Sequence, residues 1–247
     1  MKVSYSARTD RGKVRSKNED CFILAEVCGG SHLLVSAIDG CGGFGYGDVA
    51  SNTARKCICE HINALNKLSP NEGDILKSAV TYADNTILDK TRFYNSSMAC
   101  VLTAALINLE NGKMNICHVG DTRLYIYKGG KLEKQTHDHS RVGLLEETGQ
   151  ISEEEAMKHP QRNLITRRIG GGDALYDPNY IQSFTTQLEP CTLLLCSDGL
   201  YDMVHSSVTS EILKEKTPVE ERVNKLVSAA LEAGGKDNIT VVVVDIE

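Results

Sequence analysis

Several apolar runs of this chain end in an acidic residue that stands beside glycine or another turn-forming residue. The runs cover residues 34–40, 117–121 and 194–199, a fourth acidic turn covers residues 236–238, and Glu19 and Asp20 stand directly before a fifth run. A strand followed by Asp and Gly is ordinary turn chemistry when it occurs once. Four copies in one chain instead predict that the acidic side chains gather at one rim of the core, where the strands converge. These residues are Asp39, Asp121, Asp198 and Asp237.

A cluster of this kind has a chemical consequence. Two carboxylates about 4 Å apart repel each other by roughly 4 kcal/mol at an effective dielectric constant near 20. The cluster therefore persists only if its members take up protons or bind cations. Oxygen ligands without a set of His and Cys partners select hard ions, so the sequence predicts a site for Mg²⁺ or Mn²⁺ rather than zinc.

The order of the predicted elements favours an α+β fold in a single domain that spans residues 1–247. Strands are expected at residues 3–7, 21–27, 33–38, 101–107, 114–119, 124–127, 131–134, 180–185, 192–196 and 239–244, and helices at residues 48–65, 72–91 and 218–233. These elements come in batches of strands and pairs of helices rather than in strict strand–helix alternation, which is typical of α+β proteins. No linker, repeat or low-complexity tract divides the chain.

The last of these helices carries the clearest boundary signals. Thr217 is expected to cap its N-terminus, with Pro218 at the first helical position and Glu220 completing a capping box. The pair Gly234-Gly235 is expected to end it.

The charge balance and the cysteines exclude several classes of protein. Lys and Arg total 27 against 33 Asp and Glu, a net charge of −6, whereas a nucleic-acid-binding protein needs a basic face. No run approaches the roughly 18 apolar residues of a membrane span, and the polar N-terminus is unlike a signal peptide. The nine cysteines are scattered, odd in number and without zinc-site spacing. We therefore expect a reduced, cytoplasmic protein that binds neither membrane nor nucleic acid.

Two features near the first acidic run each allow two interpretations. Residues 40–45 match the glycine pattern of a dinucleotide-binding turn, but two predicted helices precede the next strand and Asp39 would repel a pyrophosphate. The glycines are better explained by a close approach of the backbone to a metal, with the Gly40 carbonyl as a ligand. Arg15 is either a solvated surface residue or a residue whose guanidinium group binds a phosphate group beside the metals through two hydrogen bonds.

Three further residues are weaker candidates for chemistry. His137 and His139 follow a predicted hairpin and are expected to be surface or hydrogen-bonded core residues rather than catalytic ones. Cys41 lacks the C-x5-R loop of cysteine phosphatases, and a metal-activated water needs no protein nucleophile. We expect Cys41 to pack beside the site.

These residues lie in motifs that resemble the PPM/PP2C family of metal-dependent serine/threonine protein phosphatases, in its bacterial form. Eight motifs follow one another in the order of that family and span nearly the whole chain. They lie at residues 15–20, 39–51, 119–123, 136–140, 159–163, 164–167, 196–199 and 235–240. One such motif is weak evidence, whereas eight in order are specific.

The resemblance implies a central antiparallel β-sandwich with helices on both outer faces, an α-β-β-α order of four layers. It also implies a cleft at one end that holds two Mn²⁺ or Mg²⁺ ions and a weaker third. By motif position, Asp39 matches the carboxylate that bridges the two ions. Asp198 and Asp237 match the other ligands of the first ion, and Glu19 and the Gly40 carbonyl match those of the second.

Further residues take roles from the same resemblance. Asp121, with Asp198, matches the residues that hold the third ion, and Arg15 matches the arginine that binds the substrate phosphate. Arg15 and Asp39 are thus the residues expected to take part in catalysis. Residues 141–177, here called the flap segment, resemble the mobile flap that contributes to substrate choice in this family.

The implied activity is hydrolysis of phosphoserine and phosphothreonine in proteins by a metal-activated water, without a phosphoenzyme. The expected partners are phosphorylated proteins and a cognate Ser/Thr kinase, and the chain itself is expected to be a monomer. Cys41 stands where eukaryotic members carry a His proposed as general acid, so the general acid stays unassigned. Two alternatives remain open: a catalytically silent module that senses or scaffolds, and a phosphomonoesterase of small molecules.

Overall fold

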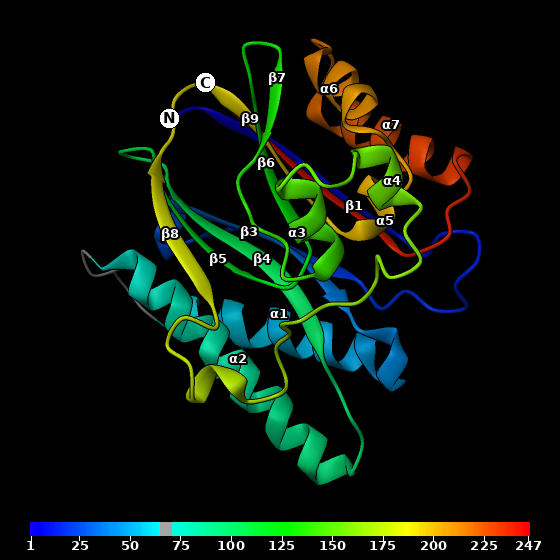
Figure 1. Ribbon diagram of the computed structural model, residues 1–247. Helices are drawn as coiled ribbons and strands as arrows, with labels where there is room; N and C mark the ends of the chain where they lie inside the picture. Colours follow the sequence, from blue (N-terminus) through cyan, green and yellow to red (C-terminus); the bar gives the residue numbers. More distant parts are fainter. Residues whose placement is uncertain (65–70) are drawn as a thin grey trace.

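The computed structural model describes residues 1–64 and 71–247, and its centre is a pair of five-stranded sheets (Figure 1). The first sheet runs in the order β1 (Val3–Asp10), β10 (Ile239–Ile246), β9 (Cys191–Cys196), β6 (Arg123–Lys128) and β7 (Lys131–Lys134). The second sheet runs in the order β2 (Cys21–Val27), β3 (His32–Gly40), β4 (Cys100–Asn108), β5 (Lys113–Val119) and β8 (Gln182–Gln187). Every strand pair in the described residues is antiparallel.

Alternation of side chains along the strands gives each sheet two apolar faces. In β3, Leu33 and Val35 pack between the two sheets, whereas Leu34 packs against helices on the outer face. In β10, Val242 lies between the sheets and Val243 lies against the helices of the opposite face. These strands are therefore buried on both sides, which explains their nearly continuous apolar sequences.

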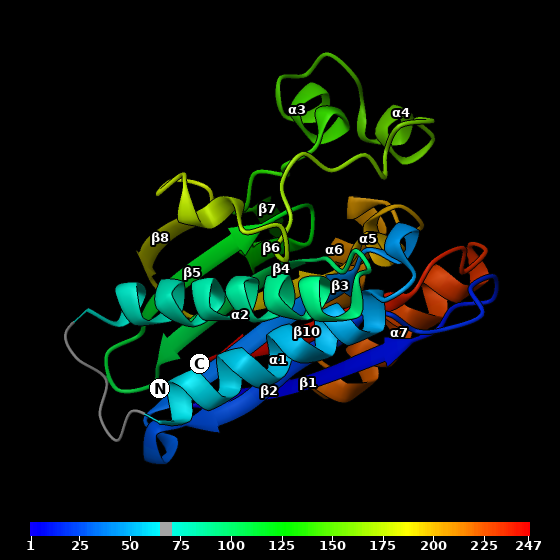
Figure 2. The same ribbon diagram turned by 90° about the horizontal axis from the view of Figure 1, so that it is seen from below.

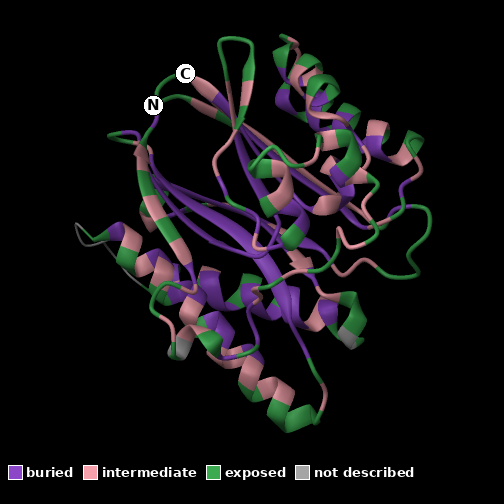
Figure 3. Cartoon of the chain, viewed as in Figure 1, coloured by how far each residue is buried: buried purple, intermediate pink, exposed green. Residues whose placement is uncertain are grey.

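Helices cover both outer faces of the sandwich, and the buried residues lie between them (Figure 3). α1 (Gly47–Asn63) and α2 (Glu72–Tyr94) pack on the second sheet, and α5 (Asp198–Tyr201), α6 (Ser206–Lys214) and α7 (Val219–Glu232) pack on the first. α3 (Arg141–Glu147) and α4 (Glu153–Met157) belong to the flap segment, which projects beyond the layers (Figure 2). The expected α+β class and the four-layer α-β-β-α order are confirmed.

The pairing register brings several strand ends to one edge of the sandwich. The start of β2 lies opposite the end of β3, where Cys21 pairs with Ile38. The start of β4 lies beside the ends of both β3 and β5. In the first sheet, the end of β9 lies opposite the start of β10, with Cys196 beside Val241. Loops that leave or enter these ends therefore meet in one place.

The predicted boundary of the last helix is wrong at its N-terminus. α7 begins at Val219 with Pro218 as its N-cap and no side-chain capping bond, so the capping box through Thr217 does not form. Thr217 Oγ1 is buried without a hydrogen-bond partner in the described structure. The predicted end is confirmed, because the Gly235 amide donates to the Ala230 carbonyl across 2.9 Å.

Other predicted elements differ from the structure at their ends. The sheets contain the ten expected strands, but β8 begins at Gln182 rather than at residue 180. Residue 65, the expected end of the first helix, lies outside the described residues. Helices α3, α5 and α6 were not expected, although Ser140 caps α3 by accepting a hydrogen bond from the Gly143 amide.

Two further expectations concern the chain as a whole. All nine cysteines are thiols rather than disulfides. Within residues 1–64 and 71–247, we find no helix with the length and apolar character needed to cross a membrane.

Candidate active site

All seven residues that the sequence singled out line one cavity of about 550 Å³ at the edge where the strand ends meet. They are Arg15, Glu19, Asp39, Gly40, Asp121, Asp198 and Asp237. Glu19 precedes β2, Asp39 lies near the end of β3, and Asp121 follows β5. Asp198 is the first residue of α5, directly after β9, and Asp237 precedes β10. Five separate segments from both sheets thus supply the five carboxylates.

Hydrogen bonds of Asn238 hold two of these loops together, the loop before β10 and the loop between β1 and β2. Its side-chain amide donates to the carbonyls of Arg11 and Lys17, each at 2.9 Å, and its Oδ1 accepts from the Glu19 amide at 2.8 Å. Across the same loops, Nη2 of Arg15 donates to Oδ2 of Asp237 at 2.7 Å. The N-terminal loop is therefore fixed against the loop that enters β10.

Gly40 has a packing role that the sequence interpretation did not include. A Cβ at this position would overlap the carbonyl groups of Gly47 and Glu19. The Ser51 hydroxyl also donates to the Glu19 carbonyl at 2.6 Å, which ties the start of α1 to the same loop. Only glycine lets these three backbone segments approach so closely, and the Gly40 carbonyl remains at the cavity wall.

The carboxyl groups of the cavity oppose one another's ionisation. Burial and then the neighbouring Asp20 and Asp198 raise the pKa of Asp39 well above its ordinary value. Burial and then Asp121 do the same to the pKa of Asp198. Burial, followed by the charge of Asp138, raises the pKa of Asp121 to about 7. Cations placed among these groups would relieve this repulsion. The electrostatics of the cavity therefore favour the binding of positive charge.

The donor set fits hard divalent ions, because it consists of carboxylates and a backbone carbonyl. In the part of the chain that the structure describes, no three His, Cys, Asp or Glu side chains converge tightly enough to hold an ion as they stand.

A family model for protein phosphatase 2C matches residues 11–238 of the chain. The chain belongs to the protein phosphatase 2C family. A curated relative, the serine/threonine phosphatase stp of Listeria monocytogenes, is 34% identical over 96% of this chain and 94% of its own length.

Solved structures of the protein phosphatase 2C family share this fold. The structure of the Mycobacterium tuberculosis serine/threonine phosphatase PstP/Ppp superposes with a TM-score of 0.85 at 32% identity, covering 99% of both chains. The catalytic domain of a PstP in complex with two manganese ions superposes with a TM-score of 0.83 at 29% identity, covering 98% of this chain and 97% of that one.

The structure also shows where Cys41, the glycines at residues 40–45, His137 and His139 lie. Cys41 lines the cavity, and burial followed by the charge of Asp39 raises the pKa of its thiol, which disfavours a thiolate nucleophile. β3 has only antiparallel neighbours, so the glycines at residues 40–45 do not belong to a dinucleotide-binding unit. His137 is exposed and pairs with Glu147, whereas His139 is half-buried and hydrogen-bonded to backbone.

One site residue was missed although its motif was recognised. Asp20 is 6% exposed, and its Oδ2 accepts from Ser197 Oγ at 2.7 Å. Among the charged neighbours, Asp20 has the largest effect on the pKa of Asp39, and burial raises its own pKa to about 6. Its position behind Asp39 depends on how distant segments fold together, so the sequence held no signal for it.

The flap segment supplies one wall of the main cavity. Asn163, Leu164, Ile165 and Arg168 line it opposite the carboxylates. Leu164 is 58% exposed there, so an apolar side chain lies beside the charged part of the cavity. Sequence reasoning assigned residues 141–177 to a flap but did not identify Asn163, Leu164 or Ile165 as lining residues.

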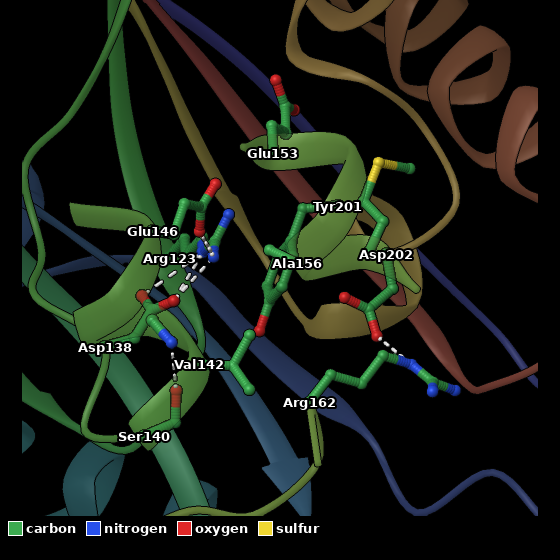
Figure 4. A pocket seen from close by; sticks show the side chains of 12 residues that line it. Arg123, Asp138, Ser140, Val142, Glu146, Glu153, Ala156, Arg162, Tyr201 and Asp202 are labelled. Carbon is green, nitrogen blue, oxygen red and sulfur yellow. Dashed lines mark hydrogen bonds and ion pairs between the residues drawn. The ribbon is translucent and has the colours of Figure 1, made fainter. Parts of the chain in front are cut away.

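Beneath the flap segment lies a second, small cavity of about 20 Å³, room for one water molecule (Figure 4). Arg123 fills one side: it pairs with Asp138 and Glu146, each at 2.7 Å, and its guanidinium lies 3.7 Å from the centre of the Tyr201 ring. On the other side, Arg162 pairs with Asp202 at 2.8 Å. Ion pairs thus dock the flap segment onto β6, through Arg123 and Glu146, and onto Asp202, which directly follows α5.

Proposed function

We propose that this chain is a protein serine/threonine phosphatase that depends on Mn²⁺ or Mg²⁺. The observation that carries the proposal is the single cavity in which five carboxylates from both sheets face one another beside Arg15. Family membership and the serine/threonine phosphatase names of its relatives support it. The structure of PstP with two manganese ions supports a centre of two ions.

In this proposal the acidic residues of the cavity divide among the ions. Asp39, Asp198 and Asp237 would hold the first ion, and Asp39, Glu19 and the Gly40 carbonyl would hold the second. Bound there, the two ions supply a more acidic water and neutralise charge on the phosphoryl group.

Two further roles complete the assignment. Asp121, with Asp198, holds a weaker third ion. The Arg15 guanidinium binds two oxygens of the phosphoryl group and stabilises the charge that grows on them.

The flap segment, residues 141–177, contributes to the choice of substrate. Its Leu164 and Arg168 lie on the cavity wall where the residues flanking a phosphoserine or phosphothreonine would pass. This placement favours an extended protein substrate over a small phosphomonoester.

We also propose one domain over residues 1–247, acting as a cytoplasmic monomer on phosphorylated proteins, including the substrates of a cognate Ser/Thr kinase. The nine thiols fit a reducing compartment.

The test is hydrolysis of p-nitrophenyl phosphate and a phosphothreonine peptide, first in EDTA and then with added Mn²⁺ or Mg²⁺. We expect turnover that requires the ion, extends to the peptide and is lost in Asp39→Asn. Asp89→Asn, at an exposed position of α2, is the matched control.

The alternatives give different results in this assay. A folded protein that binds Mn²⁺ but turns over neither substrate would be a sensing or scaffolding module. Faster turnover of nucleoside monophosphates than of the peptide at equal concentration would indicate a small-molecule phosphomonoesterase.

A further inference from the structure

The end of β5 is held on both sides by one histidine. The His139 amide donates to the Gly120 carbonyl at 2.7 Å, and the Gly120 amide donates to Nδ1 of the His139 ring at 3.0 Å. Gly120 directly precedes Asp121. The two hydrogen bonds therefore fix the peptide group that leads into the carboxylate at the cavity.

The same histidine also reaches the flap segment. Its carbonyl accepts a hydrogen bond from the Thr166 amide at 2.7 Å. Thr166 lies between Ile165 and Arg168, both of which line the main cavity. One residue thus joins the strand end, the loop after β7 and the wall opposite the carboxylates.

The ring chemistry suits an acceptor at Nδ1. An imidazole that accepts there carries its proton on Nε2 and must be neutral, because both nitrogens of a charged imidazolium are donors. Burial and then the neighbouring His118 lower the pKa of His139 to about 3. The two rings lie 4.9 Å apart, and His118 is itself bonded to Thr103 Oγ1 at 2.8 Å and to the His137 carbonyl at 3.0 Å. The acceptor is therefore present throughout the neutral range.

The backbone conformation of Gly120, which follows β5, explains why these hydrogen bonds matter. Gly120 has φ of +106°, a conformation that favours glycine, and a Cβ there would overlap the side chain of Val101. Gly120 has no side chain to restrict its backbone torsions, so the two hydrogen bonds to His139 help to fix this conformation. The other side of Asp121 is held by Tyr201, whose hydroxyl donates to the Asp121 carbonyl at 2.9 Å.

We propose that His139 is a positioning residue for Asp121: its ring and backbone hold the Gly120 peptide so that the Asp121 carboxylate faces the cavity in register with the flap wall at Thr166. The proposal rests on the proposed function in one respect, the assignment of Asp121 to the weaker third ion. His139 itself contacts neither ion nor substrate in this role.

Substitutions of His139 can distinguish a hydrogen-bonding role at Nδ1 from a role in filling space. In His139→Asn the amide Oδ1 can take the place of Nδ1 and accept from the Gly120 amide. In His139→Gln the oxygen lies one bond further out, near the Nε2 position, and in His139→Ala the acceptor is lost. His137→Asn, in the same loop but with a 73% exposed side chain, is the matched control.

The first readout is calorimetric titration with Mn²⁺ alone. We expect His139→Ala and His139→Gln to weaken the weakest ion about 10-fold or more, the usual scale for partners that orient a ligand, while the two tighter ions keep their affinities. His139→Asn and His137→Asn should stay close to the parent protein. If Asn weakens the third ion as much as Gln does, the hydrogen bond at Nδ1 does not position Asp121 and the proposal is wrong.

The second readout does not involve metal. Exchange of the Gly120 amide proton, followed by NMR in EDTA, should be faster in the Gln and Ala variants and near the parent rate in the Asn variant. Should the Ala variant fail to fold, the Asn and Gln pair still decides the matter.

The two readouts also separate this proposal from the proposed function. If the Gly120 amide proton exchanges at the parent rate in His139→Gln, the positioning role of His139 is wrong, whatever the Mn²⁺ titrations show. Absence of Mn²⁺ binding in the parent protein would overturn both the metal-dependent function and the role given to Asp121.

Discussion

Nη2 of Arg15 lies 2.7 Å from Oδ2 of Asp237, so the cation proposed to bind phosphate is paired with a carboxylate proposed to bind an ion. The hydrogen bond to Asp237 is also the main reason that the pKa of Arg15 is raised. If Asp237 binds an ion as proposed, that ion would compete with the guanidinium for the carboxylate, and the Arg15 side chain would become available to the substrate.

Replacing Arg15 tests its role in substrate binding. Hydrogen bonds to charged groups contribute about 1.5–3 kcal/mol, so Arg15→Ala should raise KM for a phosphothreonine peptide roughly 10- to 100-fold and change kcat less. Steady-state kinetics at saturating Mn²⁺ measure this, with Arg11→Ala as control in the same loop. An unchanged KM with a lowered kcat would place Arg15 in the transition state alone.

Substitution of Asp198 should reduce activity more than substitution of Asp121. Asp198→Ala removes a ligand assigned to two ions and is expected to lower kcat about 100-fold or more, because even partners that only orient ligands cost 10- to 100-fold. Asp121→Ala removes a ligand of the weaker ion and should cost much less. Mn²⁺ titrations of activity and of binding heat make the comparison. Equal losses in the two variants would contradict the assignment.

The raised pKa values of the cavity carboxyl groups predict how the stability of the metal-free protein changes with pH. The folded pKa values of about 6 for Asp20 and about 7 for Asp121 lie above the ordinary value of 3.8. Their stabilising contribution is complete below pH 3.8 and is lost as pH rises through these values. The buried His118 and His139 act in the opposite direction over this range, because their folded pKa values of about 4 and about 3 lie below the ordinary value of 6.5. In EDTA, the Tm of the parent protein relative to that of Asp121→Asn should therefore fall between pH 5 and 7.5, and Mn²⁺ should raise Tm more at pH 7.5 than at pH 5.

A substitution checks that this slope comes from the cavity. Asp121→Asn should make the slope of Tm against pH more positive, because it removes one group with a raised pKa. Asp138, whose pKa is lowered, titrates below the measured window and adds no slope there. A Tm difference between the parent protein and Asp121→Asn that stays constant from pH 5 to 7.5 would contradict the prediction.

Glu153 offers a test of the flap segment. Its carboxylate accepts from the Ser206 amide and hydroxyl, both at 2.6 Å, and lies 3.0 Å from Nε2 of His205. Glu153→Gln should loosen α4 from α6, raise KM for a phosphopeptide several-fold and leave p-nitrophenyl phosphate turnover nearly unchanged. Hydrogen exchange over residues 141–177 should increase in parallel. The neighbouring, exposed Glu154→Gln is the control, and equal effects of both variants would show that the contact is unimportant.

The sandwich could be predicted from sequence because its strands carry strong local signals. β10 and β9 are nearly continuous apolar runs bounded by turn residues, and their burial on both faces confirms the interpretation. The capping box at Thr217 failed because Pro218, rather than Thr217, takes the capping position of α7. α3 was missed because it packs around the polar Arg123 and presents no periodic apolar face.

The site was predictable in its residues and less so in its environment. Each carboxylate lies just before a recognisable apolar run or at its end, so the sequence identified all of the cavity's acidic lining residues. The placement of Asp20 behind Asp39, and of Leu164 on the flap wall, depends on how distant segments fold together. Propensity and spacing carry no information on such contacts, which is why these residues were missed.

The carboxylates of the cavity are divided between the two sheets: Asp39 and Asp121 extend from the second, and Asp198 and Asp237 from the first. The separation of the two groups is therefore set by the thickness of the apolar layer between the sheets, which includes Val35 and Val242. We expect a change of volume in that layer to alter the distance between the two groups of carboxylates without altering any of them. Interior residues far from the cleft would then help to set the spacing of the cavity's acidic side chains.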